Sequence, residues 1–217
     1  MNKEKKKLLL LGGAFLVAFI FWTALLVFLD VKEIGPRGSS VGLASLNGAF
    51  HKLTGVNMLL YNITDWLGLV PIAVAFSFAL LGLVQWIKRK SILAVDRDIL
   101  VLGGYYLLLI LVYVLFESLH VNYRPVLIDG YLEASYPSST TMLVTCIMPT
   151  AAVILCRRIK ERNFKRLVVL VIAAFTLFTV IGRIVSGVHW ITDIIGGLLF
   201  SAAFFTLYVA ATVKSKE

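Results

Sequence analysis

The sequence is poor in charged residues. Charged side chains make up 15% of the 217 residues, whereas 59% of the residues are hydrophobic and the mean hydropathy is +0.91. A soluble domain of this size carries about 25% charged and about 45–50% apolar residues. The composition therefore excludes an ordinary soluble domain and predicts a polytopic membrane protein of the all-α class.

Cysteine is also scarce. Cys146 and Cys156 both lie in or at the end of one apolar segment. Two isolated thiols provide neither a disulfide framework nor the ligands of a metal site, so we expect free thiols, no metal and no cofactor. The net charge of +9 does not indicate nucleic-acid binding, because the basic residues cluster at the ends of apolar runs instead of covering a soluble face.

Six apolar runs are long enough to cross a bilayer, which takes about 20 residues. We expect all six to be helical, because an α-helix satisfies its own backbone hydrogen bonds in hydrocarbon. The first run is too long for a signal peptide and lacks a small-residue cleavage site, so we expect it to be a retained span. We also expect a single membrane domain over residues 1–217. The expected spans are Leu8–Leu29, Leu67–Ile87, Ile99–Phe116, Ser139–Cys156, Leu167–Val185 and Asp193–Val213.

Lysine and arginine are distributed unequally between the two sides of these spans. One side holds 16 of the 21 basic residues: Lys3, Lys5, Lys6, Lys7, Lys88, Arg89, Lys90, Arg97, Arg157, Arg158, Lys160, Arg162, Lys165, Arg166, Lys214 and Lys216. The positive-inside rule predicts that this side, with both termini, is cytoplasmic. The middle of the spans lacks charged residues, which argues against a classical transporter. The pattern suits a bacterial plasma membrane.

The outside connection from Asp30 to Trp66 carries Leu43, Leu46, Phe50 and Leu53 at helical spacing. This spacing predicts an amphipathic helix at the membrane interface, where it could form a lip over a site. A loosely ordered loop with a short helix is an equal alternative.

Ionisable residues gather at the outer ends of the last two spans. Arg183, His189 and Asp193 stand between these spans, and ionisable groups at membrane depth usually mark a functional site. Asp193 follows His189 by four residues, so we expect both on one helical face. A carboxylate in that position would hold the imidazole in one tautomer and raise its basicity.

The fourth span opens with hydroxyl residues, Ser138–Thr141, directly after Pro137. Free backbone N–H groups and hydroxyls at a helix N-terminus form an anion site. The charge pattern places Arg124 and Arg183 on the same side. Two guanidinium groups and a helix N-terminus suit a phosphoryl group, because its oxygens match the fork of an arginine side chain.

At these residues the chain resembles the type-2 phosphatidic acid phosphatases, six-span lipid phosphate phosphatases whose core is shared with vanadium haloperoxidases. The family pattern is Lys-x6-Arg-Pro, Pro-Ser-Gly-His and Ser-Arg-x5-His-x3-Asp, and the matching region runs from Glu117 to Asp193. The resemblance implies that His189 is a nucleophile that forms a phosphohistidine and that Asp193 orients it. It also implies a set of phosphate-binding residues: Arg124, Ser138, Ser139 and Arg183.

Three positions depart from the family pattern. Glu117 stands where the family has a phosphate-binding lysine, Ser139 replaces a glycine, and Thr140 replaces the histidine that protonates the leaving group. A general acid contributes about 10²–10⁴-fold in rate. His120, on the same face as Arg124 if the helix continues, or Glu117 could supply a proton or charge. An interfacial histidine and a glutamate paired with an arginine are the plainer alternatives.

The loss of the acid bears on the substrate. Phosphatidate expels an alkoxide, whose conjugate acid has a pKa near that of water, about 15.7, whereas a lipid diphosphate expels a phosphate with a pKa of about 6. Thr140 therefore either favours diphosphates such as undecaprenyl diphosphate or makes the enzyme slow.

These features predict a membrane lipid phosphatase that acts at the outer face on a phospholipid or isoprenoid phosphate. A head-group transferase, or a non-catalytic lipid-phosphate binder or flippase-like protein, is the alternative. A mere binder needs no imidazole oriented by a carboxylate, so His189 and Asp193 favour the enzyme. The sequence carries no signal for the oligomeric state.

Overall fold

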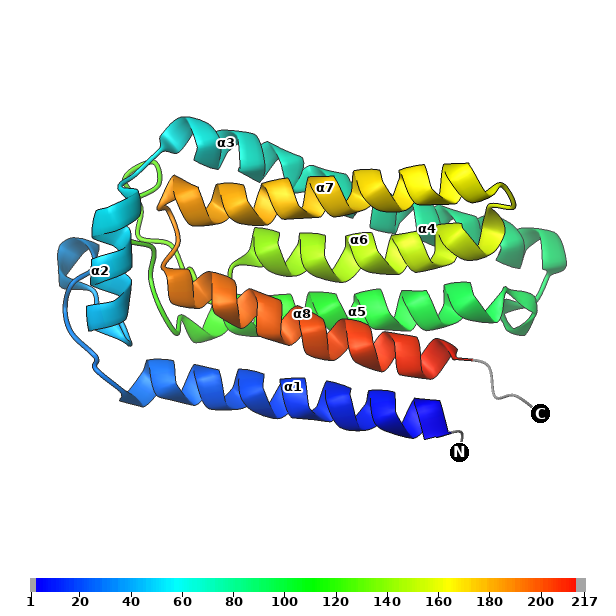
Figure 1. The fold of residues 1–217 in the computed structure, drawn as a ribbon, viewed down its shortest axis with the longest axis horizontal. Helices are drawn as coiled ribbons and strands as arrows, with labels where there is room; N and C mark the ends of the chain where they lie inside the picture. The colour runs from blue at the N-terminus through cyan, green and yellow to red at the C-terminus, as the bar shows by residue number, and fades with distance from the viewer. Residues whose placement is uncertain (1–2, 214–217) are drawn as a thin grey trace.

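The protein, as a computed structural model, is described over residues 3–213 and is built almost entirely of helices (Figure 1). In that range there is no β-strand beyond isolated bridges. The elements are α1 (Lys3–Phe28), the 3₁₀ helix η1 (Pro36–Gly38), α2 (Ala44–Thr54), α3 (Met58–Leu67), α4 (Leu69–Arg89), the 3₁₀ helix η2 (Ile92–Ala94), α5 (Arg97–Leu119), α6 (Ser139–Arg158), α7 (Arg162–Ser186) and α8 (Ile191–Thr212).

Six helical segments of residues 3–213 are long and apolar enough to cross a membrane, which confirms the all-α, six-span prediction. Five spans agree closely with their expected bounds. The second differs, because α3 and α4 follow each other across Gly68 and together extend over Met58–Arg89. A Cβ added at Gly68 would lie 2.8 Å from the carbonyl oxygen of Asp65, so the junction requires a residue without a side chain.

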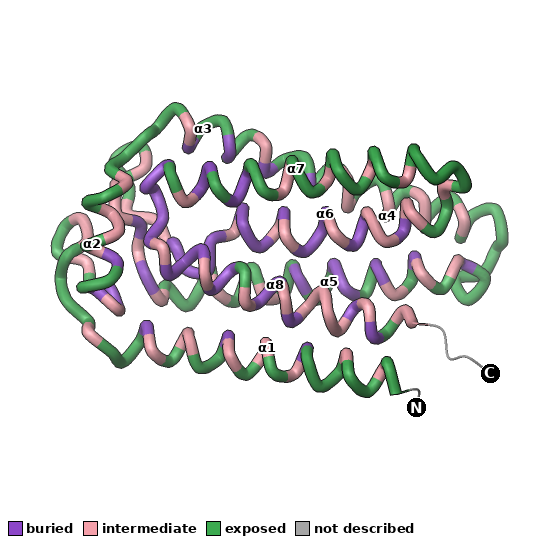
Figure 2. Tube along the Cα trace, in the orientation of Figure 1, coloured by how far each residue is buried: buried purple, intermediate pink, exposed green. Residues whose placement is uncertain are grey.

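The long helices lie side by side, with α6 in the interior of the bundle and α1 packed along α8 (Figure 1). In the most apolar window of α6, 56% of the residues are buried, against 17% for α1 and 11% for α3–α4. Figure 2 shows the same difference in burial between the inner and outer helices. The outer helices therefore present apolar side chains such as Phe21, Phe76 and Leu111 outwards, as a lipid-facing surface requires.

The two ends of the bundle differ in chemistry. The α4–α5 and α6–α7 connections lie with both described chain ends at one end, whereas α2, the 120–138 connection and the α7–α8 turn lie at the other (Figure 1). The first end carries the basic clusters expected to be cytoplasmic; Lys214 and Lys216 lie outside the described residues. Ion pairs of Asp96 with Arg89 and Arg158 connect three helices there.

The 11-residue helix α2 lies in the connection in which an amphipathic helix, or a loop with a short helix, was expected. Leu43 caps this helix instead of belonging to it. Leu46 and Leu53 are exposed, whereas Asn47 is fully buried and donates hydrogen bonds to the Gly42 carbonyl and to Thr192 Oγ1 (2.8 and 2.9 Å). The hydrogen bond from buried Asn47 to Thr192 therefore connects α2 to the start of α8.

Candidate functional site

Residues 121–138 form a narrow antiparallel ribbon at the site end of the bundle. Tyr123 and Ala134 make an isolated β-bridge, and Asp129 and Gly130 turn the chain with φ angles of 49° and 82°. A two-residue Asp-Gly turn with both φ angles positive is a favoured hairpin turn, because its twist matches that of the flanking strands. The register of this hairpin pairs Arg124 with Glu133.

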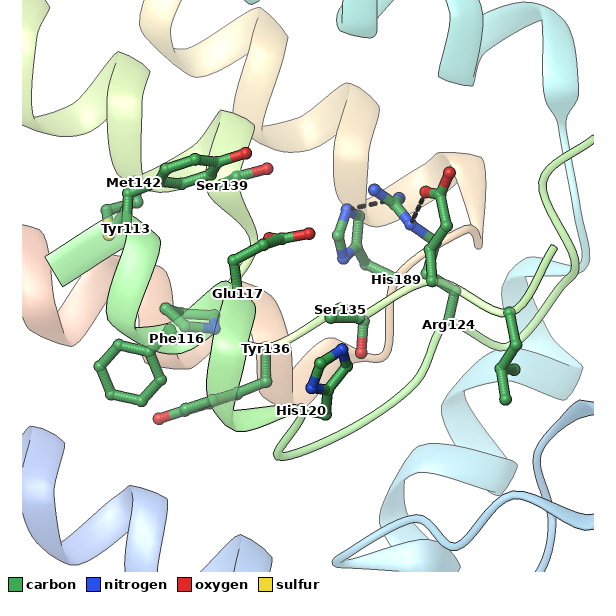
Figure 3. A pocket seen from close by; sticks show the side chains of 14 residues that line it. Tyr113, Phe116, Glu117, His120, Arg124, Ser135, Tyr136, Ser139, Met142 and His189 are labelled. Atoms are coloured by element: carbon green, nitrogen blue, oxygen red, sulfur yellow. Dashed lines mark hydrogen bonds and ion pairs between the residues drawn. The ribbon is translucent and has the colours of Figure 1, made fainter. Parts of the chain in front are cut away.

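Arg124 is held in this ribbon between two partners. Its Nε lies 3.0 Å from Glu133 Oε2 across the ribbon, and its Nη1 lies 3.0 Å from His189 Nε2. Figure 3 shows both contacts in one close-up. Arginine has no acceptor atom, so Arg124 donates and His189 Nε2 accepts, which places the proton of a neutral imidazole on Nδ1.

His189 is only 5% exposed and lies in the turn between α7 and α8. The chain leaves α7 through Gly187, whose φ of 65° is a left-handed conformation that glycine adopts readily. Burial, and then the positive charges of Arg124 and Arg183, lower the pKa of His189 well below 6.5. The imidazole is therefore neutral near pH 7, and its Nε2 lone pair accepts the hydrogen bond from Arg124.

Asp193 is fully buried in the first turn of α8. Its Oδ2 accepts the backbone N–H of Trp190 (3.0 Å) and lies 3.6 Å from His189 Nδ1, while its Oδ1 accepts Asn122 Nδ2 (3.4 Å). The expectation that His189 and Asp193 share one helical face is wrong, because His189 precedes the helix. The two meet because Asp193 caps the helix start, at a separation too long for a hydrogen bond.

The N-terminus of α6 provides part of the expected anion site. The Ser138 N–H donates to the Asp193 carbonyl (3.1 Å), so it is not free, but Ser138 Oγ is buried without a hydrogen-bond partner among residues 3–213. Ser139 begins the helix. The first N–H groups of a helix have no intrahelical acceptor and can bind an oxygen ligand.

Thr140 packs against the junction between α3 and α4. It is 6% exposed, and its Cγ2 would lie 3.4 Å from a Cβ added at Gly68. The position at which the family has a histidine therefore borders a close helix contact, which leaves little room for a larger side chain.

Arg183 is fully buried, and its partners come from α3. Its Nη2 lies 3.1 Å from Asp65 Oδ1, and its guanidinium carbon lies 4.7 Å from the centre of the Tyr61 ring. Arg124 lies 5.7 Å from the same ring. The sequence analysis missed Tyr61 and Asp65, and their four-residue spacing on one helix face was the available signal.

A cavity of about 370 Å³ brings Glu117, His120, Arg124, Ser139 and His189 together (Figure 3). The helix does not continue to His120, because α5 ends at Leu119 and His120 has a left-handed φ of 47°, so the condition for a face shared with Arg124 is not met. The remaining predicted residues, Ser138, Thr140, Arg183 and Asp193, lie outside the lining.

Fold and site together define a helical membrane protein with a polar cavity that contains an arginine, a histidine and the first residue of helix α6. The PAP2 superfamily model matches residues 72–217, so the chain belongs to the PAP2 superfamily. This membership confirms the family resemblance found in the sequence and supports a membrane lipid phosphatase.

The fold agrees with a solved relative. The crystal structure of a transmembrane PAP2-type phosphatidylglycerolphosphate phosphatase from Bacillus subtilis superposes with a TM-score of 0.56, at 20% sequence identity, over 93% of this chain and 94% of that one. At this identity the likeness shows the shared fold. None of the curated protein sequences compared with the chain matches it.

Proposed function

We propose that the protein hydrolyses a lipid phosphate or diphosphate through a covalent phosphohistidine on His189. The observation that carries the proposal is the contact of His189 Nε2 with Arg124 Nη1 at 3.0 Å in a shared cavity. A neutral, buried imidazole beside an arginine provides a nucleophile next to a phosphate-binding group.

The first step follows from the donors of Arg124. A bound phosphoryl group would take up these donors, and His189 Nε2 would then be free to attack phosphorus. The bond from phosphorus to the leaving oxygen breaks as the nitrogen–phosphorus bond forms, and the leaving group departs with the electron pair. Water then attacks phosphorus, and the nitrogen–phosphorus bond breaks with its electron pair returning to His189 Nε2. One proton of the water passes to solvent, and inorganic phosphate leaves with neutral His189 restored.

Two further groups support phosphate binding. Arg183 Nε and Ser138 Oγ are buried and have no hydrogen-bond partner among residues 3–213, so each has a donor left for a phosphate oxygen. Buried polar groups are normally paired, and an orphan group calls for an explanation. Asp193, fixed by Trp190 and Asn122, would position the imidazole.

The lining of the cavity supports a lipid substrate. Tyr113 and Phe116 on α5 and Met142 on α6 also line it, and all three belong to membrane-spanning helices. A tail could therefore lie in the membrane while the phosphate reaches His189. The distribution of basic residues supports an outer-face site with both termini in the cytoplasm.

Thr140 supports a preference for diphosphates over monoesters. Its hydroxyl cannot replace an acidic imidazole as proton donor at neutral pH, so a leaving group that departs as a stable anion is favoured. The general acid that is missing would contribute about 10²–10⁴-fold for an alkoxide leaving group.

The test is phosphate release by detergent-purified protein from undecaprenyl diphosphate and from phosphatidate. We expect faster release from the diphosphate and loss of both activities in His189→Ala. A ³²P-labelled substrate should leave acid-labile label on His189. Turnover that persists in His189→Ala would refute the nucleophile, and faster release from phosphatidate would refute the leaving-group argument.

A further inference from the structure

Helix α3 links the two arginines of the site through one aromatic ring. The guanidinium carbon of Arg183 lies 4.7 Å from the centre of the Tyr61 ring, and that of Arg124 lies 5.7 Å from the same centre. A guanidinium group within about 6 Å of a ring centre is attracted by the electron density of the ring face. Tyr61 is 7% exposed, so this attraction acts away from bulk water, where it is strongest.

The position of Tyr61 is fixed by the packing of α3 on the end of α7 (Figure 1). Asn57 caps the start of α3, and its backbone N–H donates to the Ser186 carbonyl at 2.9 Å. A Cβ added at Gly182 would lie 2.5 Å from Thr64 Cγ2, so the two helices also meet closely one turn further on. Tyr61 therefore lies on a helix that is fixed to α7 at two points.

The ring contributes something that the ion-pair partners of the arginines do not. Arg124 and Arg183 are both positively charged and lie against one ring, so they repel each other when no anion is bound. Glu133 and Asp65 offset part of this repulsion, but each takes up N–H donors that a phosphate needs. The ring acts through its face, which contains no acceptor atom, and Arg183 Nε has no hydrogen-bond partner in the described part of the chain. The ring therefore stabilises both cations and leaves donors for an anion.

Resting on the proposed function, we infer that Tyr61 is a positioning residue that holds Arg124 and Arg183 together as a preformed phosphate clamp. The phosphate binds to the N–H donors of the two arginines and not to Tyr61 itself. Tyr61 lies before residue 72, where the match to the PAP2 superfamily model begins. The clamp therefore brings a helix outside the matched residues into the active site.

The first test removes the ring from the detergent-purified protein. Tyr61→Leu should weaken orthovanadate binding about tenfold, since a desolvated cation–π contact contributes about as much. KM should rise by a similar factor with little change in kcat, because the clamp binds the phosphate equally in the substrate and in the transition state. Tyr61→Phe keeps the ring and should restore the affinity. A Tyr61→Phe protein that binds as weakly as Tyr61→Leu would overturn the inference and assign the effect to the hydroxyl group.

The second test changes the electrons of the ring and leaves its shape nearly unchanged. Phenylalanine with one, two or three ring fluorines at position 61 carries progressively less negative charge on the ring face. The orthovanadate affinity of the folded protein, measured by calorimetry, should therefore decrease with each added fluorine. The same series at Phe21, which is exposed on α1, is the matched control and should leave the affinity unchanged. An affinity that does not depend on the fluorines at position 61 would overturn the inference, because a ring that only fills space is equivalent in all these variants.

These measurements separate the clamp from the proposed hydrolysis. Orthovanadate binding without phosphate release from undecaprenyl diphosphate or phosphatidate would refute the hydrolysis, while the fluorine series would still decide the role of Tyr61. Phosphate release that is lost in His189→Ala, together with binding that ignores the fluorines, would support the phosphatase and overturn the clamp.

Discussion

Asp65→Asn should lower stability and tighten phosphate binding at the same time. Asp65 is the ion-pair partner of Arg183, which is fully buried. Removing one partner of a buried pair costs about 3–5 kcal/mol, but the Asp65 side chain is 52% exposed. We therefore expect a loss of about 1–2 kcal/mol, because water screens an exposed partner. At about 2–4 °C per kcal/mol, Tm falls by about 2–8 °C.

The gain in affinity follows from the same geometry. A carboxylate on one side of Arg183 and a phosphate on the other lie about 6 Å apart and repel by about 3 kcal/mol at an effective dielectric constant of 20. Solvent exposure of Asp65 reduces this to about 1–2 kcal/mol, so orthovanadate or phosphate should bind about 5–30-fold more tightly to Asp65→Asn.

Thermal unfolding and vanadate inhibition in detergent measure the two effects on one preparation. Asp98→Asn is the matched control, because Asp98 pairs with Arg158 at the opposite end of the bundle. It should leave vanadate binding unchanged. If Asp65→Asn weakened vanadate binding, Asp65 would position Arg183 for phosphate instead of competing with it, and the reasoning would be refuted.

Three further predictions concern single contacts. The NMR resonance of the His189 imidazole should not titrate as the pH falls through 6.5, because the pKa of His189 is lowered in the folded state. In the unfolded chain His189 binds its proton at higher pH. The free energy of unfolding should therefore decrease as the pH falls below about 6.5. A midpoint near 6.5 would contradict this. Asn122→Leu should lower kcat about tenfold with little change in KM, because the Asp193 carboxylate loses a buried hydrogen-bond donor worth about 1–3 kcal/mol. An unchanged kcat would show that Asn122 does not help Asp193 to position His189. Gly42→Ala should strongly reduce the folded yield, because its Cβ would lie 1.7 Å from Leu26 O, whereas Gly13→Ala, with open space, should not.

The fold follows from the sequence because hydrocarbon leaves the backbone few choices. Long apolar runs must be helical, and five of the six spans could be located within a few residues. The second span was placed nine residues late, since Tyr61, Thr64 and Asp65 dilute its hydropathy. The burial of Tyr61 and Thr64, and the packing of α3 on α7, are tertiary properties that no local window detects.

The site was predictable where its residues are close in the chain. His189 and Asp193 meet within one turn, although through a helix cap in place of a shared face. Glu133 was missed because its contact with Arg124 depends on the ribbon register. Asp129-Gly130 between two apolar pairs was the signal for that register, because this dipeptide favours a two-residue hairpin.

The partners of Arg183 required a different kind of information. Asp65 lies 118 residues away in the chain, and only the packing of α3 on α7 brings it to the arginine. The local sequence around Arg183 does not indicate which helix carries its carboxylate partner. Contacts of this kind depend on the global arrangement of spans, which membrane hydropathy does not specify.

Two of the three departures from the family pattern, Thr140 and Glu117, differ in physical origin, and this difference can be measured. Thr140 is buried beside Gly68, so Thr140→His overpacks the α3–α4 junction and should cost about 1–3 kcal/mol of stability. Glu117 is exposed, so Glu117→Lys should change stability by less than about 0.5 kcal/mol.

The rate of phosphatidate hydrolysis is the second measurement, after stability, for variants of Thr140. Because the junction leaves little room for an imidazole directed at the leaving group, Thr140→His should not raise the rate, while Thr140→Ser should preserve Tm. A Thr140→His protein with native Tm and a rate raised about 10²-fold or more would show that a general acid fits this position. Packing would then not account for the threonine, and the preference for diphosphates would have to arise from the substrate pocket.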